Sequence, residues 1–511
     1  MRNPQASSRE TLWTLPELFA RAGVCASDGG EVPTVPITSL MDDSRSVHAG
    51  ACFVAVRGVG RDGHDFVPAA VASGAAAIVV DRDRPAPSGV AVVRVADTRI
   101  ALAKLAAAYY GLCGDVEPTL HIIGVTGTNG KTTVAWLLRS ILQAAHRPTA
   151  MLGTLEYDLV GERRPSPLTT PGSIELCRNL ATARDAGATH AVLEVSSHAL
   201  DQRRCDGLTF AAGVFTNLTG DHLDYHHTMD AYFSAKRRLF EMLAPSAVAV
   251  VNVDDPMGEL LVKSTTAQVV SYGIDSPCAE VRSDIEGMDR CGTEFVLRGR
   301  AMEMSIRTPL IGRHNGLNAL AAAATAEAIG VPPEAIRSGL EHVICVPGRL
   351  QRAEPPGWPF SVFIDYAHSD DALGNVLRTL RPLTTGTLRC VFGCGGDRDR
   401  TKRPRMAAVV GMLADVAYVT SDNPRTEEPH SIIDEILHGF SPTHACRIVV
   451  DVDRKRAIEA ALVDSEPGDT VLIAGKGHEK YQLVGDRVLP FDDVEIARRW
   501  INAAALTEVV A

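Results

Sequence analysis

The chain has 511 residues, of which 45% are hydrophobic and 22% charged, a composition typical of a globular protein with roughly two to four domains. Its net charge of −11 argues against a general basic surface for nucleic acid or anionic lipid. The 11 cysteines form no CxxC pair, and the N-terminus lacks the apolar run of a signal peptide. No apolar run is long enough for a membrane span. We therefore expect a cytoplasmic protein that binds neither nucleic acid nor membrane.

The first part of the chain combines short strands with one long helix. Strand-like runs lie at 51–56 ("ACFVAV"), 75–80 ("AAAIVV") and 91–95 ("AVVRV"), and an alanine-rich helix is predicted at 98–112. The following segment 113–121, "CGDVEPTLH", contains Gly and Pro and is predicted to be a linker.

From residue 121 onward, apolar strands alternate with helical stretches. The runs at 121–127, 190–197, 210–218 and 247–255 each contain a continuous apolar stretch, as strands buried on both faces do. We therefore predict a doubly wound α/β sheet in this region.

A second boundary is expected near 345–353, "CVPGRLQRA". Beyond it, four apolar runs each end in Gly, Asp, Asn or His; they lie at 360–368, 387–396, 414–424 and 469–479. Ligands of open α/β sheets meet the carboxyl ends of the strands, so these polar ends are candidate site residues.

Residues 122–133, "IIGVTGTNGKTT", have the features of a phosphate-binding loop. A strand enters a glycine-rich turn and a helix follows, so backbone N–H groups and a helix N-terminus face one point. Lys131 would reach the terminal phosphates, and the Thr132 hydroxyl would bind Mg²⁺. The strict G-x4-G-K-[ST] pattern is not met, because Gly124 is one residue too early and Val125 takes its place. A glycine-rich turn without a ligand remains the alternative.

Two further strand ends carry possible metal ligands. Taken alone, each polar residue could be an ordinary loop group, but both stretches follow strands as the phosphate loop does, and Mg²⁺ beside a phosphate needs few protein ligands. The candidates are Glu194, Ser196, Ser197 and His198 after one strand, and Asn217, Asp221, His222 and Asp224 after the next. From spacing alone, Lys236 in a helical stretch is predicted to be a surface lysine, like Arg237 and Arg238.

The turn "TSDNPRTEEP" (420–429) places Arg425 among acidic residues. Asp422, Glu427, Glu428 and Asp434 are close in sequence. Arg425 is either a solvated surface group or a guanidinium that awaits the carboxylate of a ligand.

Many motifs, in one order, make the chain resemble the Mur ligases. They are "GVTGTNGKTT", "EVSSHAL", "FTNLTGDHLDYH", "GRHNGLNALAA", "VPGRLQ", "DYAHSDDAL", "FGCGGDRDRTKRP", "SDNPRTEEP" and "AGKGHEKYQ". The segment 42–66 also resembles the UDP-binding domain of that family, so the resemblance covers nearly the whole chain from about residue 36.

The resemblance implies three α/β domains. Residues 1–117 would form a small UDP-substrate-binding domain, 118–345 a central ATP-binding domain with a P-loop-type doubly wound sheet, and 346–511 a Rossmann-like domain for the incoming amino acid. The implied enzyme is a monomeric ligase of peptidoglycan precursor synthesis. It adds meso-2,6-diaminopimelate to the D-glutamate of UDP-N-acetylmuramoyl-L-alanyl-D-glutamate through an acyl phosphate, with ATP as co-substrate and Mg²⁺ as cofactor. Domain closure on ATP binding is expected as well.

The resemblance also implies roles for individual residues. The implied catalytic residues are Lys131, Glu194, His222 and Lys236, and the implied Mg²⁺ ligands are Thr132, Glu194, His222 and Lys236 as its carbamate. ATP contacts are expected from Gly127, Thr128, Asn129, Gly130, Lys131, Thr132, Thr133, Asn315, Arg349 and Asp365. UDP-substrate contacts are expected from Ser44, Val59, Gly60, Arg61, Thr169, Thr170, Ser196, Gln202 and Arg204. The sequence "TTPG" at 169–172 departs from the pattern of some members, and Arg203 competes with Arg204 for its role.

By the same resemblance, "DNPR" selects the added amino acid. Arg425 would bind the distal carboxylate of diaminopimelate in a planar bidentate pair and repel the ammonium of L-lysine. The pocket is expected to consist of Arg398, Asp422, Asn423, Pro424, Arg425, Gly475 and Glu479.

Three alternatives remain. Arg425 argues against the same ligase acting on L-lysine, and the UDP-type N-terminal segment argues against a folylpolyglutamate synthetase. The set of Lys131, Glu194, His222 and Lys236 argues against a nucleotide-binding protein without ligase activity.

Overall fold

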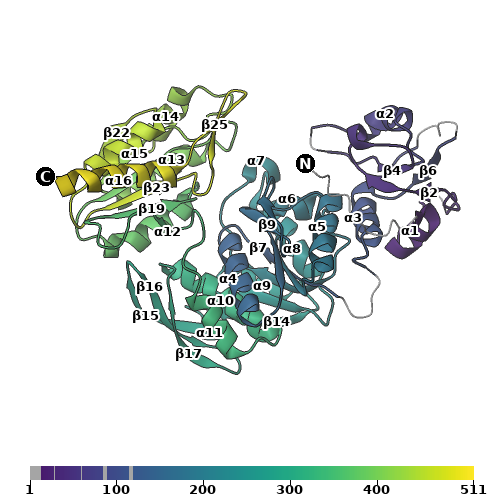
Figure 1. Cartoon of the computed structure of the whole chain (residues 1–511), viewed down its shortest axis with the longest axis horizontal. Coiled ribbons are helices and arrows are strands. Elements are labelled where there is room, and N and C mark those ends of the chain that lie inside the picture. Colours follow the sequence, from purple (N-terminus) through teal and green to yellow (C-terminus); the bar gives the residue numbers. More distant parts are fainter. Residues whose placement is uncertain (1–12, 28, 59, 84–88, 114–118, 511) are drawn as a thin grey trace.

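The computed structural model describes residues 13–27, 29–58, 60–83, 89–113 and 119–510, which fold into three parts that follow one another along the chain. In Figure 1 the N-terminal part (purple) lies to the right, the central part (blue to green) in the middle and the C-terminal part (green to yellow) at the upper left. Each part is built around its own sheet. The α/β class predicted from the alternation of strands and helices is confirmed.

The N-terminal part contains a four-stranded parallel sheet in the order β3-β4-β5-β6. The runs predicted at 51–56, 75–80 and 91–95 form β4, β5 and β6, and the predicted alanine-rich helix forms α3. The elements are β1 (Trp13–Thr14), α1 (Leu15–Ala22), β2 (Pro36–Ile37), β3 (Ser39–Met41), η1 (Ser44–Ser46), β4 (Ala51–Val54), η2 (Gly63–Phe66), α2 (Val67–Ala72), β5 (Ala77–Val80), β6 (Ala91–Arg94) and α3 (Thr98–Tyr109).

The central part is an 11-stranded sheet in the order β10-β9-β8-β11-β7-β12-β13-β14-β15-β16-β17. From β8 to β15 the neighbouring strands run parallel, as predicted for the runs that form β7, β11, β12 and β13. The strands are β7 (His121–Thr126), β8 (Thr149–Leu152), β9 (Glu156–Asp158), β10 (Arg163–Pro165), β11 (His190–Glu194), β12 (Phe210–Phe215), β13 (Val248–Asn252), β14 (Gln268–Gly273), β15 (Val281–Asp289), β16 (Gly292–Arg298) and β17 (Glu303–Thr308).

Helices pack against this sheet and supply its core. Helix α4, which follows the phosphate loop, buries Val134, Leu137, Leu138 and Ile141 against the strands. The helices are α4 (Lys131–Ala144), α5 (Ser173–Asp185), α6 (Ser197–Asp201), α7 (Leu223–His226), α8 (Met229–Glu241), α9 (Pro256–Val262), α10 (Arg313–Ala328) and α11 (Pro333–Glu341).

The antiparallel ends of the central sheet were not predicted. Strands β15, β16 and β17 pair antiparallel at one end, and β8, β9 and β10 at the other. In β17, "EMSIRT" at 303–308, residues alternate between exposed and buried, so this strand lacks the continuous apolar run that marks the inner strands.

The C-terminal part is a six-stranded sheet in the order β18-β19-β23-β20-β21-β22, parallel except for β18. A separate hairpin, β24–β25, follows it. The elements are β18 (Gln351–Arg352), β19 (Ser361–Asp365), α12 (Asp370–Leu380), η3 (Arg381–Leu383), β20 (Leu388–Phe392), α13 (Lys402–Leu413), β21 (Val416–Val419), α14 (Pro429–Leu437), β22 (Arg447–Val450), α15 (Arg454–Val463), β23 (Thr470–Ala474), β24 (Tyr481–Val484), β25 (Arg487–Pro490) and α16 (Asp493–Val510).

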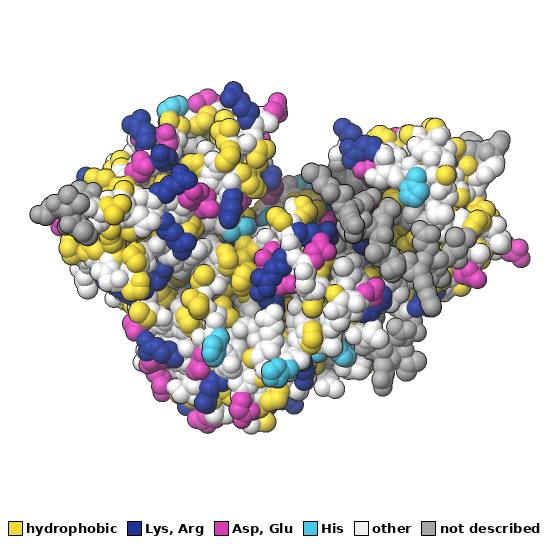
Figure 2. Space-filling view, viewed as in Figure 1, with side chains coloured by type: hydrophobic (Ala, Val, Ile, Leu, Met, Phe, Trp, Pro, Cys, Tyr) yellow, Lys and Arg dark blue, Asp and Glu magenta, His cyan; other side chains and the backbone are white. Residues whose placement is uncertain are grey.

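The domain boundaries at 117/118 and 345/346 stay predictions, although each falls between the strands of two different sheets. The face shown in Figure 2 carries basic and acidic side chains interspersed with apolar ones. Within the described part of the chain, no helix combines the length and apolar character needed to cross a membrane.

Candidate active site

The phosphate loop lies between β7 and α4 at the carboxyl edge of the central sheet. Gly127 has φ +149°, and a Cβ there would lie 1.9 Å from Thr216 Oγ1. Gly130 has φ +88°, and a Cβ there would lie 2.3 Å from Asn318 Oδ1. Only glycine fits these two positions, so the tight turn predicted from "GTNGKTT" is present although the strict pattern is not met.

The segment after β12 holds this loop in place. Asn129 N donates to Asn217 Oδ1 at 2.9 Å, and Thr128 N donates to the Asn217 carbonyl at 2.8 Å. The Thr216 hydroxyl donates to the Asn129 carbonyl at 2.6 Å. The loop is therefore fixed by neighbouring backbone and amide groups, and Thr132 and Thr133 are buried in the first turn of α4.

Lys236 is buried, so the surface position predicted from its spacing is wrong. It lies on the inner face of α8, is 1% exposed, and donates from Nζ to the Gly127 carbonyl at 2.7 Å. Lys131 Nζ donates to the same carbonyl at 2.9 Å and to the Thr128 carbonyl at 2.8 Å. Burial, together with the charge of Lys131, holds the pKa of Lys236 well below its ordinary value. The spacing of residues did not predict this burial, because a helix face that packs under a loop can carry the same polar residues as a face exposed to solvent.

Glu194 ends β11 beside the phosphate loop and is 1% exposed. Its Oε2 accepts from the Thr132 hydroxyl at 2.9 Å and from the Thr154 hydroxyl at 3.0 Å, and its Oε1 accepts from Thr154 N at 2.8 Å. The structure thus brings together two predicted metal ligands, and it adds Thr154, which the sequence analysis did not single out.

His222 is the last residue of the loop between β12 and α7. It adopts a left-handed backbone conformation (φ 56°), and its Nε2 lies 3.5 Å from Asp221 Oδ2. Desolvation lowers the pKa of His222, although Asp221 opposes the shift. The ring of His198 packs edge-on against it, with 4.9 Å between centroids. A neutral imidazole is the form that binds a metal.

These residues suit a hard cation that takes few protein ligands. Within the described ranges, no three His, Cys, Asp or Glu side chains form a ready metal cage. Mg²⁺ keeps waters and substrate oxygens in its shell, so a buried carboxylate and a threonine hydroxyl at the phosphate loop fit it without such a cage.

Three predicted nucleotide contacts lie where the central and C-terminal parts meet. Arg349 Nη2 lies 3.4 Å from the Thr132 hydroxyl. Asp365 Oδ2 accepts from Leu350 N at 2.6 Å. Asn315, on α10, accepts from Asn318, the side chain that faces Gly130. All three positions therefore face the phosphate loop or connect to it.

A direct contact also joins the two parts at the loop. Asn129 Nδ2 donates to Asp371 Oδ2, on α12, at 3.1 Å. The sequence analysis assigned no role to Asp371 or Asn318, although they lie inside the quoted motifs "DYAHSDDAL" and "GRHNGLNALAA".

The residues predicted for the UDP-substrate fall into two groups. On the central sheet, the Thr170 hydroxyl donates to the Glu194 carbonyl at 2.7 Å and accepts from Ser196 N at 3.0 Å. Arg204 Nη1 donates to the Thr170 carbonyl at 2.8 Å and Nη2 to Gln202 Oε1 at 2.7 Å. Arg203 instead pairs with Asp206 at 3.3 Å, so Arg204 is the arginine that faces this group. Thr169 joins it through the Thr154 hydroxyl at 3.1 Å.

The second group lies on the N-terminal sheet. Ser44 begins η1, and the exposed residues Gly60 and Arg61 belong to a turn closed by a hydrogen bond from Gly58 N to the Arg61 carbonyl at 2.8 Å. Val59 lies outside the described residues.

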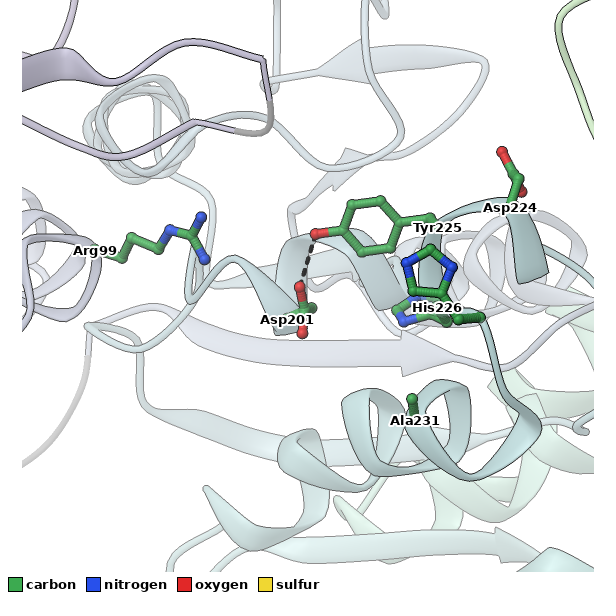
Figure 3. Close-up of a pocket in the computed structure, with 7 residues that line it drawn as sticks. Arg99, Asp201, Asp224, Tyr225, His226 and Ala231 are labelled. Atoms are coloured by element: carbon green, nitrogen blue, oxygen red, sulfur yellow. Dashed lines mark hydrogen bonds between the residues drawn. The ribbon is translucent and has the colours of Figure 1, made fainter. Parts of the chain in front are cut away.

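A cavity of about 460 Å³ is lined by Arg99, Asp201, Asp224, Tyr225, His226, His227 and Ala231, none of which was predicted to bind the UDP-substrate. Figure 3 shows Arg99 of α3 on one side and Tyr225 with Asp201 on the other. The Tyr225 hydroxyl donates to Asp201 Oδ2 at 2.7 Å and accepts from Gln202 Nε2 at 3.2 Å. Arg99 Nη2 donates to the Arg57 carbonyl at 2.7 Å, next to the exposed turn. Two residues that line the cavity are thus hydrogen-bonded to Gln202 of the first group and to Arg57, which precedes the exposed turn of the second.

Arg425 occupies the turn after β21 and has no carboxylate partner among the described residues. Its backbone is left-handed (φ 52°) and is held by β24, through Arg425 N to the Leu483 carbonyl at 3.0 Å and Gly485 N to the Arg425 carbonyl at 2.7 Å. Its Nη1 donates to the Gly396 carbonyl at 2.7 Å. The guanidinium keeps donors for a ligand.

Two of the acidic residues near Arg425 in sequence, Glu427 and Glu428, have other partners. Glu427 accepts from both terminal nitrogens of the buried Arg403, at 2.8 and 3.0 Å. Glu428 caps α14 by accepting from Ser431 N at 2.8 Å. These contacts favour the ligand-binding interpretation of Arg425 over the solvated one.

The other residues predicted for this pocket surround the same turn. Asn423 Nδ2 donates to Glu479 Oε2 at 2.8 Å. Gly475 has φ +112°, and a Cβ there would lie 2.7 Å from Asp422 Oδ2. Pro424 is buried, whereas Arg398 is exposed beside Gly395, which both Arg398 and Arg425 approach. All seven residues thus lie around one turn. Lys476, which bonds to Asn423 and Glu479, was missed, although it lies inside the quoted motif "AGKGHE".

The chain is similar to known proteins along most of its length. It matches the Mur ligase middle domain at residues 125–326, the Mur ligase glutamate ligase domain at 348–477, and the domain described as "Mur ligase family, catalytic domain" at 36–110. It is 44% identical to UDP-N-acetylmuramoyl-L-alanyl-D-glutamate–2,6-diaminopimelate ligase of Geobacter metallireducens, over 92% of this chain and 95% of that protein.

Solved structures agree with this similarity. A structure of a UDP-N-acetylmuramoyl-L-alanyl-D-glutamate–2,6-diaminopimelate ligase aligns with a TM-score of 0.68 and 32% identity, over 94% of this chain and 99% of that one. MurF ligase from Thermotoga maritima, solved in complex with ADP, aligns with a TM-score of 0.61 over 92% of this chain and 98% of that one; at 19% identity it shows the fold alone.

Proposed function

The chain belongs to the Mur ligase family, and we propose that it joins 2,6-diaminopimelate to UDP-N-acetylmuramoyl-L-alanyl-D-glutamate with hydrolysis of ATP to ADP and phosphate. The observation that carries this function is the 44% identity to a ligase of that name over 92% of the chain. The product is a precursor of peptidoglycan.

The first step is phosphoryl transfer from ATP to the D-glutamate γ-carboxylate. The γ-phosphoryl group moves to a carboxylate oxygen, ADP leaves, and an acyl phosphate remains. Lys131 and the backbone N–H groups of 127–133 offset the charge that develops on the phosphate oxygens. The contacts of Lys131 with loop carbonyls place its ammonium over the turn where the phosphates bind.

The second step is attack by an amine of diaminopimelate on the acyl carbon. The amide bond forms, the amine loses a proton and inorganic phosphate leaves. Two substrates must be aligned across three domains, and that alignment supplies much of the rate. Contacts such as Asn129–Asp371 join the domains at the loop, which supports closure of the C-terminal part on nucleotide binding.

Mg²⁺ fits the residues at the loop as the cofactor. Thr132, Glu194 and His222 would hold Mg²⁺, Lys236 as its carbamate would help to hold a second Mg²⁺, and the ions would neutralise charge on phosphate oxygens. The lowered pKa of Lys236 supports carbamylation, because the neutral amine is the form that reacts with CO₂. The carbamate would also replace repulsion between two ammonium groups at Gly127 by attraction to Lys131.

The substrates occupy the three parts in chain order. The uridine end meets Ser44, Val59, Gly60 and Arg61, and the muramoyl-peptide meets Thr170 and Arg204 of the central part. The distal carboxylate of diaminopimelate, in its meso form, pairs with Arg425. The enzyme acts as a monomer in the cytoplasm, where ATP and UDP-linked precursors occur.

The test is phosphate release from ATP in the presence of UDP-N-acetylmuramoyl-L-alanyl-D-glutamate. Three arms contain meso-diaminopimelate, L-lysine or no amino acid. Release only with diaminopimelate, with a product of the expected mass, is the predicted result. Release with L-lysine instead would keep the ligase and overturn the role of Arg425, and release with neither would overturn the function.

A further inference from the structure

Lys476 is a buried cation that the reaction above does not use. It lies in the loop after β23, and its side chain is 0% exposed. A buried ammonium is costly unless it is paired and hydrogen-bonded. Its partners are therefore the place to look for its role.

Both partners of Lys476 belong to the amino-acid pocket. Its Nζ donates to Glu479 Oε2 at 2.9 Å and to Asn423 Oδ1 at 3.1 Å. Asn423 Nδ2 donates to the same Glu479 oxygen at 2.8 Å. The three side chains close a triangle of hydrogen bonds, which fixes the orientation of the Asn423 amide and of the Glu479 carboxylate.

The triangle also connects to strand β24 of the hairpin, which holds the turn with Arg425 in place. Leu483 N donates to Asn423 Oδ1 at 2.9 Å, and the Leu483 carbonyl accepts from Arg425 N at 3.0 Å. Gln482 Nε2 donates to the Asp422 carbonyl at 2.7 Å. Displacing Lys476 would thus loosen the contacts that hold the 422–425 turn against β24.

Apart from the exposed Arg398, the charged side chains of the pocket fall into two pairs. Lys476 and Glu479 neutralise each other. In the described part of the chain, neither Asp422 nor Arg425 forms an ion pair, so one carboxylate and one guanidinium are left for the ligand. The distal end of diaminopimelate carries one ammonium and one carboxylate, whereas the distal end of L-lysine carries an ammonium alone. A pocket with balanced charge favours the zwitterionic end.

We infer that Lys476 is a positioning residue that determines selectivity for a zwitterionic distal group over a simple ammonium, by neutralising Glu479 and orienting Asn423. This inference deepens the proposed function and rests on it. Without the Lys476 charge, Glu479 would be an unpaired carboxylate in the pocket, and the pocket would attract an added cation.

The test compares the variants Lys476→Met, Lys476→Arg and Lys476→Met/Glu479→Gln with the wild type. KM and kcat are measured for meso-diaminopimelate, L-lysine, ATP and the UDP-substrate by phosphate release. Lys455→Met is the matched control, because this lysine is exposed on α15 of the same domain and pairs only with Glu459.

For Lys476→Met we expect the KM for diaminopimelate to rise at least about tenfold, as loss of a charged hydrogen bond implies. The preference for diaminopimelate over L-lysine should fall by at least about tenfold, while the KM values for ATP and the UDP-substrate stay within about twofold of the wild type. Lys476→Arg should keep the preference because it keeps the cation. The double variant should recover part of it because the unpaired carboxylate is gone. Lys455→Met should change none of these values.

The contrary results are specific. An unchanged preference in Lys476→Met would overturn the inference while the proposed function stands. Equal rises of KM for all three substrates would show a general loss of structure and overturn it too, as would a double variant no better than Lys476→Met. A wild type without diaminopimelate-dependent phosphate release would overturn the proposed function and this inference with it.

Discussion

The phosphate loop of the central part and the amino-acid pocket of the C-terminal part satisfy their polar groups in different ways. At the phosphate loop the predicted catalytic side chains bond to one another or to the loop itself: Thr132 to Glu194, and Lys131 and Lys236 to Gly127. In the amino-acid pocket, Glu479 and Asn423 are paired internally, but the guanidinium of Arg425 has no carboxylate partner in the described part of the chain.

This difference fits two separate roles: phosphoryl transfer at the phosphate loop and selection of the amino acid in the pocket. Phosphoryl transfer needs groups held in place before the substrate arrives, and their mutual bonds hold them. Selection between similar amino acids needs a charge that only the correct ligand can satisfy. Changes at the loop should therefore act on kcat, and changes in the pocket on the KM of one substrate.

The largest effect is expected from Lys131→Met. Loss of the ammonium that faces the phosphates should lower kcat by about 10²–10³-fold, the usual cost of a group that stabilises a developing anion. Phosphate release measures it, and the exposed Lys263→Met on the same part is the control. A variant that retains more than a tenth of the wild-type kcat would contradict the assignment.

The next effect concerns the carbamate of Lys236. Lys236→Ala should lower kcat by about 10²-fold, and depleting CO₂ from the wild-type sample should lower activity in a way that bicarbonate reverses. A carbamate carbon signal in NMR after labelling with ¹³C-bicarbonate, absent from Lys236→Ala, checks the modification itself. The same signal in both proteins would rule out Lys236 as its site.

Arg425→Lys should act on one substrate only. A lysine cannot form the planar bidentate pair, so the KM for diaminopimelate should rise by about 10–100-fold while the KM for ATP is unchanged. Arg456→Lys, an exposed arginine of the same domain, is the control. If the KM for ATP rose equally, the separation of the two regions would fail.

The sequence alone predicted more of the phosphate loop than of the amino-acid pocket. The loop followed from general chemistry, because glycine, lysine and threonine at that spacing have few other uses. Arg425 was left open between surface and ligand until the family resemblance was considered. Lys236 was misplaced, since its burial depends on the packing of α8 under a loop 109 residues away in sequence.

Residues that act through tertiary contact were beyond sequence reasoning. Thr154 meets Glu194, and Asn318 meets the phosphate loop, only because strands and helices distant in the chain converge there. The antiparallel ends of the central sheet were missed for another reason. Half-buried strands lack the continuous apolar run by which the inner strands were recognised.

Glu427→Gln should have the smallest effect on activity. It should lower the free energy of unfolding instead. Arg403 holds the pKa of Glu427 at about 2, below its ordinary value of 4.5. The stability this ion pair contributes is therefore present above about pH 4.5 and is lost as the pH falls toward 2. We expect the variant to lose about 1–3 kcal/mol near pH 7, less near pH 3, with KM values unchanged.

Urea unfolding at several pH values measures this loss. Glu459→Gln, at an exposed ion pair with Lys455, should change stability little. A raised KM for diaminopimelate in Glu427→Gln would place Glu427 in the amino-acid pocket and contradict its assignment to stability alone.

The most direct test of the account is a crystal structure with meso-diaminopimelate and a nonhydrolysable ATP analogue bound. We predict that the distal carboxylate forms two parallel hydrogen bonds with Arg425, at about 2.7–2.9 Å, while the Lys476–Glu479 pair stays intact. A distal carboxylate bound elsewhere, with Arg425 turned to solvent, would contradict the assignment of selection to the "DNPR" turn.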